Sequence, residues 1–202
     1  MVTSIIYAVL AYFLGNILGG KLLEKIYKED LSKTGSGNVG ARNAGRVLGA
    51  RSFVFVLAVD FFKGFFIVIL LKILNVDAKT IYICILFVIL GHIKPILFNF
   101  KGGKGIATFF GTMAALSLNL FLVLILCTVV IAIIVKSTTI GFYSSLPLIT
   151  FLNYIETPSF VILIIFILII GLLSVVGVKD IEEAFEKYFR TPAKKVKKKP
   201  AR

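Results

Sequence analysis

Residues 52–74 read "SFVFVLAVDFFKGFFIVILLKIL", an apolar run broken only by Asp60, Lys63 and Lys72 among charged residues. Crossing a hydrocarbon layer of roughly 30 Å takes about 20 residues in a helix, so this run is long enough to span a membrane. Similar runs recur along the 202-residue chain, which is 58% hydrophobic with a mean hydropathy of +0.99. The sequence therefore predicts an all-α, polytopic membrane protein with a single membrane domain.

The apolar pattern predicts about seven transmembrane helices, at 3–22, 52–74, 79–98, 104–117, 119–135, 139–155 and 159–178. The segment 104–135 reads either as one long bent helix or as two short ones, with Ser117–Asn119 as the proposed turn. No Lys or Arg precedes the first apolar run, so we expect a first transmembrane helix rather than a cleavable signal. The predicted organisation is a membrane domain at 1–178 followed by a basic tail at 179–202.

Positive charge is distributed unevenly between the two sides of this predicted bundle. The chain has 23 Lys and Arg and a net charge of +13, and most of the cations fall in loop 21–51, in segment 91–105 and in the tail. Loops rich in Lys and Arg stay on the cytoplasmic side. We therefore expect the N-terminus outside the cell and the C-terminus in the cytoplasm. The tail "AKKVKKKPAR" should lie against anionic headgroups, which attract each such cation by about 1 kcal/mol.

Metal and cofactor sites are not expected. Cys84 and Cys127 lie singly in apolar runs, no CxxC occurs, and His92 is the only histidine, which is too little for a structural zinc site. We read both cysteines as small buried apolar residues. The lipid bilayer, and not nucleic acid, is the expected partner of the positive charge.

Two glycine-rich segments stand out from the apolar background. The first, "TGSGNVGARNAGRVLG" at Thr34–Gly49, contains a literal GxGxxG, but a dinucleotide site needs a preceding strand, and here the flanks are polar on one side and a membrane helix on the other. The second, "GHIKPILFNFKGGKGIAT" at Gly91–Thr108, is not a P-loop, because Phe98 and Gly105 stand where that motif needs Gly and Ser or Thr.

Both segments nevertheless have the properties of an anion site. Glycines allow consecutive backbone N–H groups to point into one concavity, and a helix that begins after such a loop adds a partial positive charge. No carboxylate occurs at 31–59 or 81–116. The interleaved cations and small polar residues, which favour a phosphate site over two merely solvated basic loops, are Ser36, Asn38, Arg42, Asn43, Arg46, Lys101 and Lys104.

Three further ionisable residues are open to two interpretations. Asp60 and Lys63 lie three residues apart on one helix face, either as a mutually neutralising pair that fixes helix packing, which we favour, or as a relay or substrate contact. His92 is either a structural histidine bonded to the backbone or a catalytic or phosphate-contacting residue next to the cationic loop.

The two glycine-rich segments resemble the two cytoplasmic motifs of the bacterial acylphosphate-dependent glycerol-3-phosphate acyltransferases, which are small seven-helix membrane enzymes of phospholipid synthesis. The family patterns are approximately Gly-Ser-Gly-Asn-x-Gly-Ala-Thr-Asn-x-x-Arg and Gly-His-x-x-Pro-x-x-x-x-Phe-x-Gly-Gly-Lys-Gly-x-Ala-Thr. The matching positions are Ser36, Asn38, Asn43, Arg46, His92, Lys104 and Thr108. The resemblance covers Gly35 to about Thr108.

The resemblance implies transfer of a fatty acyl group from acyl phosphate to the 1-hydroxyl of sn-glycerol 3-phosphate, giving lysophosphatidic acid and phosphate at the cytoplasmic face of the cell membrane. It implies three catalytic residues, which are Ser36, His92 and Lys104. It implies substrate phosphate binding by Gly37, Asn38, Gly40, Asn43, Arg46, Gly102, Gly103, Lys104 and Thr108. No metal or cofactor is implied, because the mixed anhydride is already an activated acyl donor.

The chain also departs from the family pattern. Arg42 stands where the family has Thr, and "VKSTTIGFYSS" at 135–145 replaces an Arg…Ser…Ser pattern, with Thr138, Thr139, Ser144 and Ser145 as candidate substitutes. Near the C-terminus "VGVKDIEEAF" offers Gly177 and Asp180 in place of an Arg-His…Asn-Ile segment. The alternatives are a divergent paralogue with another donor or acceptor, or a small-anion transporter.

Overall fold

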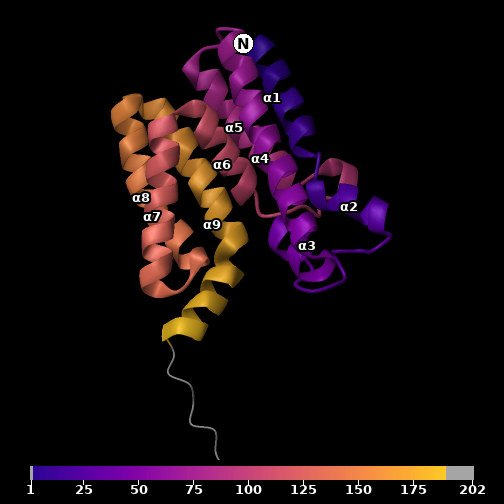
Figure 1. Ribbon diagram of the computed structural model, residues 1–202. Helices are drawn as coiled ribbons and strands as arrows, with labels where there is room; N and C mark the ends of the chain where they lie inside the picture. The colour runs from indigo at the N-terminus through magenta and orange to yellow at the C-terminus, as the bar shows by residue number, and fades with distance from the viewer. Residues whose placement is uncertain (1, 190–202) are drawn as a thin grey trace, which may run out of the picture.

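The computed structural model describes residues 2–189 and contains helices but no strand within that range (Figure 1). The elements are α1 (Val2–Gly15), α2 (Gly19–Tyr27), α3 (Ala41–Leu48), α4 (Ala50–Ile73), α5 (Ala78–Ile93), the short 3-10 helix η1 (Ile96–Phe98), α6 (Ile106–Leu116), α7 (Leu118–Val135), α8 (Thr138–Glu156) and α9 (Phe160–Phe189). Residues 190–202, which hold most of the predicted basic tail, lie outside the described part.

Five stretches are long and apolar enough to cross a membrane, at Val2–Tyr27, Ala50–Ile73, Ala78–Phe98, Leu118–Val135 and Phe160–Lys187. This finding confirms the prediction of an all-α membrane protein. Segment 104–135 forms two helices, as one of its two readings predicted. The break falls at Ser117, whose side chain accepts a hydrogen bond from the backbone N–H of Leu120 over 3.3 Å and so caps α7.

The structure differs from the predicted helices in three respects. The continuous helix predicted at 3–22 is interrupted between α1 and α2, and α9 runs past residue 178 to Phe189. The eight-residue α3 was not predicted, because its sequence "ARNAGRVL" is polar and contains a helix-weakening glycine. Helix α3 depends on tertiary packing, since Ala44 is buried in a small cluster with Leu31 and Val56.

The interruption of the first helix is stabilised by side chains from other elements. Asn16 is buried, and its amide group donates to the carbonyl of Tyr12 and accepts from the N–H of Leu97. Lys63 of α4 donates to the carbonyls of Gly15 and Ile17, which the break leaves without helical partners. The break therefore ties α1 to α4 and to the loop after α5.

The bundle has α5 near its centre and α7 at its periphery, where α7 exposes most of its apolar surface. Tyr82, Phe109 and Phe166 are among the largest fully buried side chains and join α5, α6 and α9. Helices α4 and α6 pack so closely that a Cβ on Gly111 would lie 1.9 Å from the carbonyl oxygen of Phe61. Small residues that allow such backbone approach are typical of helix contacts in membranes.

The connections separate into two ends of the bundle (Figure 1). The N-terminus and the α4–α5 turn lie at one end, whereas α2, α3 and the last turns of α9 lie at the other. Segments 28–40, 94–105 and 136–137 join elements at this second end. Both glycine-rich segments therefore meet at one end of the molecule.

Candidate functional site

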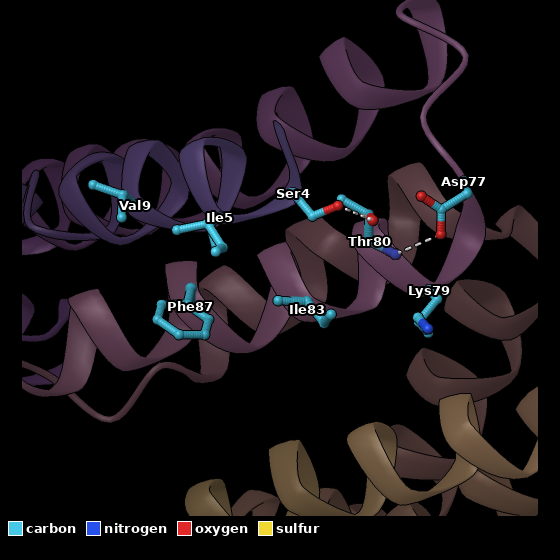
Figure 2. Close-up of a pocket in the computed structure, with 9 residues that line it drawn as sticks. Ser4, Ile5, Val9, Asp77, Lys79, Thr80, Ile83 and Phe87 are labelled. Carbon is cyan, nitrogen blue, oxygen red and sulfur yellow. Dashed lines mark hydrogen bonds between the residues drawn. The ribbon is translucent and has the colours of Figure 1, made fainter. Parts of the chain in front are cut away.

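A cavity of about 560 Å³ lies between α1 and α5 near the N-terminal end of the bundle (Figure 2). Thr80 donates to Ser4 across it, and the side chain of Asp77 caps α5 by accepting the N–H of Thr80. Hydrogen bonds from Thr80 lower the pKa of Asp77 below its usual value. The remaining lining is mostly apolar, and none of the predicted site residues contributes to this cavity.

A larger cavity of about 970 Å³ lies at the opposite end. Segments from both glycine-rich motifs, from the α7–α8 turn and from α9 line it. Seven predicted site residues are in its wall: Ser36, Asn38, Gly40, Asn43, Arg46, His92 and Lys104. The structure therefore brings together most of the side chains that the sequence predicted. Gly37, Gly102, Gly103 and Thr108 are not among its lining residues.

Asn43 organises the loop that precedes α3. Its side-chain oxygen accepts the N–H of Ser36 over 2.8 Å, and its amide nitrogen donates to the carbonyls of Leu31 and Thr34 over 3.0 and 2.9 Å. The side chain is buried, and Gly35 and Gly37 adopt positive φ angles that let the loop turn around it. These contacts use most of the hydrogen-bonding capacity of the Asn43 amide, so the residue positions Ser36 within the cavity wall.

The N-terminus of α3 faces the cavity. Gly40 caps the helix and lines the cavity together with Ala41 and Arg42. Its carbonyl accepts the N–H groups of Asn43 and Ala44, whereas the N–H groups of Ala41 and Arg42 precede the first helical bond. Unpaired N–H groups and the helix dipole make this end of α3 a favourable place for a phosphate oxygen.

Two arginines of α3 have different surroundings. Arg42 donates to the hydroxyls of Thr138 and Thr139 at the start of α8, over 3.2 Å in the case of Thr139. Arg46 lines the cavity and has no carboxylate partner within residues 2–189. Arg46 is thus available to a bound anion, while Arg42 joins the first motif to α8.

Two of the four candidate hydroxyl residues in the segment 135–145 line the cavity and two do not. Thr138 and Thr139 line the cavity. Ser145 is buried and donates to the carbonyl of Phe142 over 2.7 Å, and Ser144 is exposed and outside the cavity wall. Arg42 and segment 135–145, two places where the chain departs from the family pattern, are therefore in direct contact with each other.

Lys104, from the second glycine-rich segment, forms an ion pair with Asp180 of α9. Both side chains are about one quarter exposed, at 27% for Lys104 and 25% for Asp180. Glu183 and Lys187 of the same helix also line the cavity. The sequence offered Asp180 only as a departure from the family pattern, and its pairing with Lys104 was missed, because no carboxylate occurs near the motifs along the chain and only the return of α9 brings Asp180 close.

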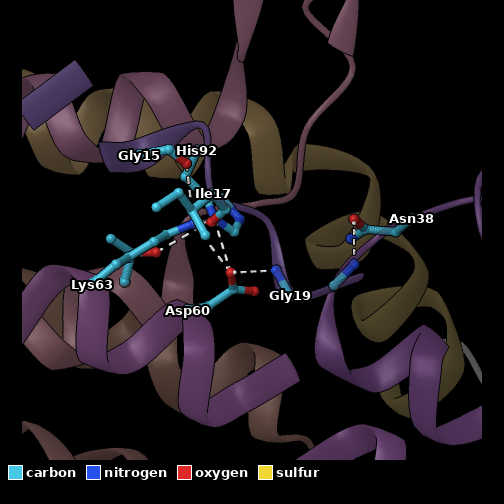
Figure 3. A network of polar contacts seen from close by, with 9 residues as sticks. Gly15, Ile17, Gly19, Asn38, Asp60, Lys63 and His92 are labelled. Carbon is cyan, nitrogen blue, oxygen red and sulfur yellow. Dashed lines mark hydrogen bonds and ion pairs between the residues drawn. The ribbon is translucent and has the colours of Figure 1, made fainter. Parts of the chain in front are cut away.

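His92 belongs to a buried polar network with Asp60 and Lys63 (Figure 3). The ammonium nitrogen of Lys63 lies 2.7 Å from His92 Nδ1 and 3.1 Å from Asp60 Oδ1. The same Asp60 oxygen accepts the N–H of Gly19 at the start of α2 over 3.3 Å. Asp60 and Lys63 form the ion pair that the favoured packing interpretation predicted, and the pair also contacts the one histidine of the site.

The Gly102–Gly103 backbone lies against His92. Gly103 donates its N–H to the carbonyl of His92 over 3.1 Å, and a Cβ on Gly103 would lie 2.3 Å from His92 Nε2. Thr108 is fully buried behind the ring, with its hydroxyl 3.4 Å from Nδ1. These residues shape the surroundings of His92, and nothing in the contacts tests the prediction that they bind substrate phosphate.

Apolar side chains line the cavity together with the polar residues described above. The apolar lining residues are Phe53, Leu57, Ile106, Phe110, Ile133 and Phe142. Leu57 and Ile133 are also exposed on the outer surface of the helices, at 39% and 71%. The wall therefore connects cationic groups to the surface that faces lipid. Together, the fold and this site define a membrane-embedded protein that can bind an anionic headgroup and an apolar chain side by side.

Comparison with known proteins gives a consistent family. Residues 5–185 match the family described as glycerol-3-phosphate acyltransferase. A glycerol-3-phosphate acyltransferase of Blochmanniella floridana is 35% identical over 170 residues, which cover 83% of this chain and 87% of the relative. One from Finegoldia magna is 38% identical over 138 residues, covering 68% of this chain and 69% of the relative.

Solved structures agree with the sequence comparison. The crystal structure of PlsY (YgiH), an integral membrane glycerol 3-phosphate acyltransferase, in its glycerol 3-phosphate form superimposes with a TM-score of 0.84 at 29% identity, covering 92% of this chain and 94% of that one. The lysophosphatidic acid form gives a TM-score of 0.81 at 28% identity, covering 92% and 93%. The chain belongs to the glycerol-3-phosphate acyltransferase family, and it is an integral membrane acyltransferase of phospholipid synthesis.

Proposed function

We propose that the protein transfers a fatty acyl group from acyl phosphate to the 1-hydroxyl of sn-glycerol 3-phosphate, giving lysophosphatidic acid and inorganic phosphate. The new ester bond forms as the bond between the acyl carbon and the phosphate oxygen breaks, and the hydroxyl proton ends on the released phosphate. The observation that carries the proposal is the cavity of about 970 Å³ in which cations of both motifs face an apolar wall.

Charge distribution supports two phosphate-bearing substrates. Two such anions repel each other, so a site that brings them together has to supply cations and directed N–H groups. Arg46 and the N-terminus of α3, from the first motif, and Lys104, from the second, line the same cavity. We assign Arg46 and Lys104 to substrate phosphates, Ser36 to a glycerol hydroxyl, and the N–H groups at the start of α3 to a phosphate oxygen, because the N–H groups of Gly37 and Gly103 already donate to the carbonyls of Thr34 and His92.

An activated acyl donor suits the groups in the cavity. An acyl-enzyme route needs a nucleophilic hydroxyl or thiol paired with a base, and among the described residues the Ser36 hydroxyl has no such partner. The Thr108 hydroxyl approaches Nδ1 of His92, but that nitrogen already contacts Lys63 at 2.7 Å. Direct attack of the glycerol hydroxyl on acyl phosphate requires no enzyme nucleophile, in agreement with what the family resemblance implies about the donor.

Membrane orientation follows from the same groups. The end of the bundle that holds the cavity also holds segments 21–51 and 91–105, which together contain ten Lys and Arg residues. The positive-inside rule places this end in the cytoplasm, where glycerol 3-phosphate is dissolved, and it places the N-terminus outside. We propose a seven-span arrangement in which α6 and α8 cross together with the five long apolar stretches. The acyl chain then enters sideways from the bilayer.

One assay tests the donor and the acceptor together. Purified protein in detergent receives glycerol 3-phosphate with either acyl phosphate or acyl-CoA, and lysophosphatidic acid and phosphate are quantified. We expect product only with acyl phosphate, and we expect Lys104→Ala and Arg46→Ala to lose most of it while membrane insertion persists. Product from acyl-CoA alone would reassign the donor. Absence of both lysophosphatidic acid and released phosphate with either donor would favour the small-anion transporter, because a transporter releases no phosphate from these substrates.

A further inference from the structure

A buried lysine, Lys63, contacts one ring nitrogen of His92. Lys63 is 5% exposed, and its ammonium nitrogen lies near four acceptors: the carbonyl oxygens of Gly15 at 3.1 Å and Ile17 at 2.6 Å, Asp60 Oδ1 at 3.1 Å and His92 Nδ1 at 2.7 Å (Figure 3). Two carbonyls and a carboxylate form a cage that stabilises the ammonium form.

An ammonium group has three N–H donors and no lone pair, so it cannot accept a hydrogen bond. Its three donors are here shared among four neighbours, of which the carbonyl of Ile17 at 2.6 Å and His92 Nδ1 at 2.7 Å are the nearest. A contact of 2.7 Å between Lys63 Nζ and His92 Nδ1 is therefore one in which the lysine donates and Nδ1 accepts. Nδ1 then carries no proton. A neutral histidine of this kind has its proton on Nε2, and we assign this tautomer from the contacts.

The opposite edge of the ring opens into the cavity. His92 lines the cavity, and its Nε2 has no hydrogen-bond partner among residues 2–189. The only fully enclosed side-chain atoms without a partner in that part of the chain are Glu24 Oε1 and Asn153 Nδ2. Nε2 is therefore not fully enclosed, and it lies beside Gly103, where a Cβ would approach it to 2.3 Å.

We propose that Lys63 is a positioning residue that fixes His92 as the Nε2–H tautomer, so that His92 acts as a hydrogen-bond donor to a substrate oxygen and not as a general base. The proposal rests on the proposed function for the identity of that oxygen, which belongs to a phosphate or to the acyl carbonyl as negative charge develops on it. A donor aimed at developing charge typically contributes a factor of about 10² to 10³ in rate.

The single histidine of the chain allows a direct test that does not depend on activity. Protein labelled with ¹⁵N-histidine and purified through a tag without histidine gives signals from His92 alone. We expect Nδ1 in the unprotonated range and Nε2 in the protonated range at neutral pH. A protonated Nδ1 in the unaltered protein would overturn the proposal, even if acyl transfer from acyl phosphate is confirmed.

Lys63→Met tests the role of the lysine, and Lys72→Met is the matched control. Lys72 lies on the same helix α4 and likewise donates to two backbone carbonyls, those of Ala115 and Leu116 at 2.7 Å, but it is remote from His92. We expect Lys63→Met to move proton population to Nδ1, where the Thr108 hydroxyl can accept it, and Lys72→Met to leave the spectrum unchanged. Identical spectra for all three proteins would refute the role of Lys63.

Two substitutions of His92 separate donor from base even if Lys63→Met fails to fold. In His92→Gln the side-chain oxygen can accept from Lys63 while the amide group donates into the cavity, and it contains no base. In His92→Phe the donor is lost. We expect kcat of His92→Gln to exceed that of His92→Phe by about a hundredfold with similar KM values. Equal loss in both variants would show that His92 acts as a base.

Discussion

Replacing Asp180 with Asn should improve substrate binding, because the carboxylate occupies Lys104 where a substrate phosphate is expected. The amide side chain keeps the shape of Asp180 and removes its negative charge. The phosphate would then reach Lys104 without breaking an ion pair and without facing a carboxylate. A substitution in a cavity wall that lowers KM is unusual. A lower KM in Asp180→Asn would show that the carboxylate competes with substrate for Lys104, whereas a higher KM would show that it helps to bind the substrate.

The magnitude follows from the exposure of the pair. With 27% of the Lys104 side chain and 25% of the Asp180 side chain exposed, water still screens the interaction, so it is worth about 1 kcal/mol at most. A difference of 1.4 kcal/mol is tenfold in affinity, so this pair accounts for about fivefold in KM. Protein stability should fall by no more than the same amount.

The assay is steady-state acyl transfer in detergent with either substrate varied at fixed ionic strength, and Glu182→Gln is the matched control. Glu182 lies on the same helix, is exposed and does not line the cavity, so it reports the effect of net charge alone. We expect less than about a twofold change for it, because salt screens distant charges. A raised KM in Asp180→Asn would mean that the carboxylate helps to bind the substrate, and the reasoning would then be refuted.

Three other predictions concern the loops of the site. Gly103→Ala should lower kcat by about a hundredfold, because a Cβ 2.3 Å from His92 Nε2 displaces the ring; unchanged kcat in a folded variant would contradict this. Asn43→Ala should lower the free energy of unfolding by about 1–3 kcal/mol, because it leaves buried carbonyls unpaired, and chemical denaturation in detergent measures the loss. Hydrogen bonds from Ser32, then from Lys33, lower the pKa of Asp30 from 3.8 to about 2. Since the folded-state pKa is the lower one, this contact stabilises the loop above pH 3.8 and is lost as the pH falls toward 2; amide exchange at Ser32 should speed up over that range in the unaltered protein and not in Asp30→Asn.

Membrane class and the principal cations of the site could be predicted from the sequence, because both depend on local pattern. Apolar runs of membrane-spanning length are visible in any window, and glycines interleaved with Arg46 and Lys104 indicate an anion site wherever the chain folds. The prediction of the family from these two motifs was confirmed by the comparisons. The catalytic role of Ser36 toward a glycerol hydroxyl and the role of the glycines toward substrate phosphate stay predictions.

Other features depended on contacts between residues far apart in the chain, and no local pattern carries such information. The break before α2 exists because Lys63 and Asp60 of α4 satisfy the backbone groups that it exposes. The short helix α3 is held by packing. The carboxylate of Asp180 contacts Lys104 only because α9 packs next to the second glycine-rich segment.

The sequence by itself determined that this chain is a helical membrane protein with two cationic, glycine-rich segments. Only the tertiary structure decided what individual residues do there. Asn43, which matches the expected phosphate motif and lines the cavity, also holds the loop before α3, and Lys63, read as a packing residue, also contacts His92 Nδ1. The physical reason is that a polar side chain takes its role from the partners that surround it once the helices pack, and those partners come from other elements.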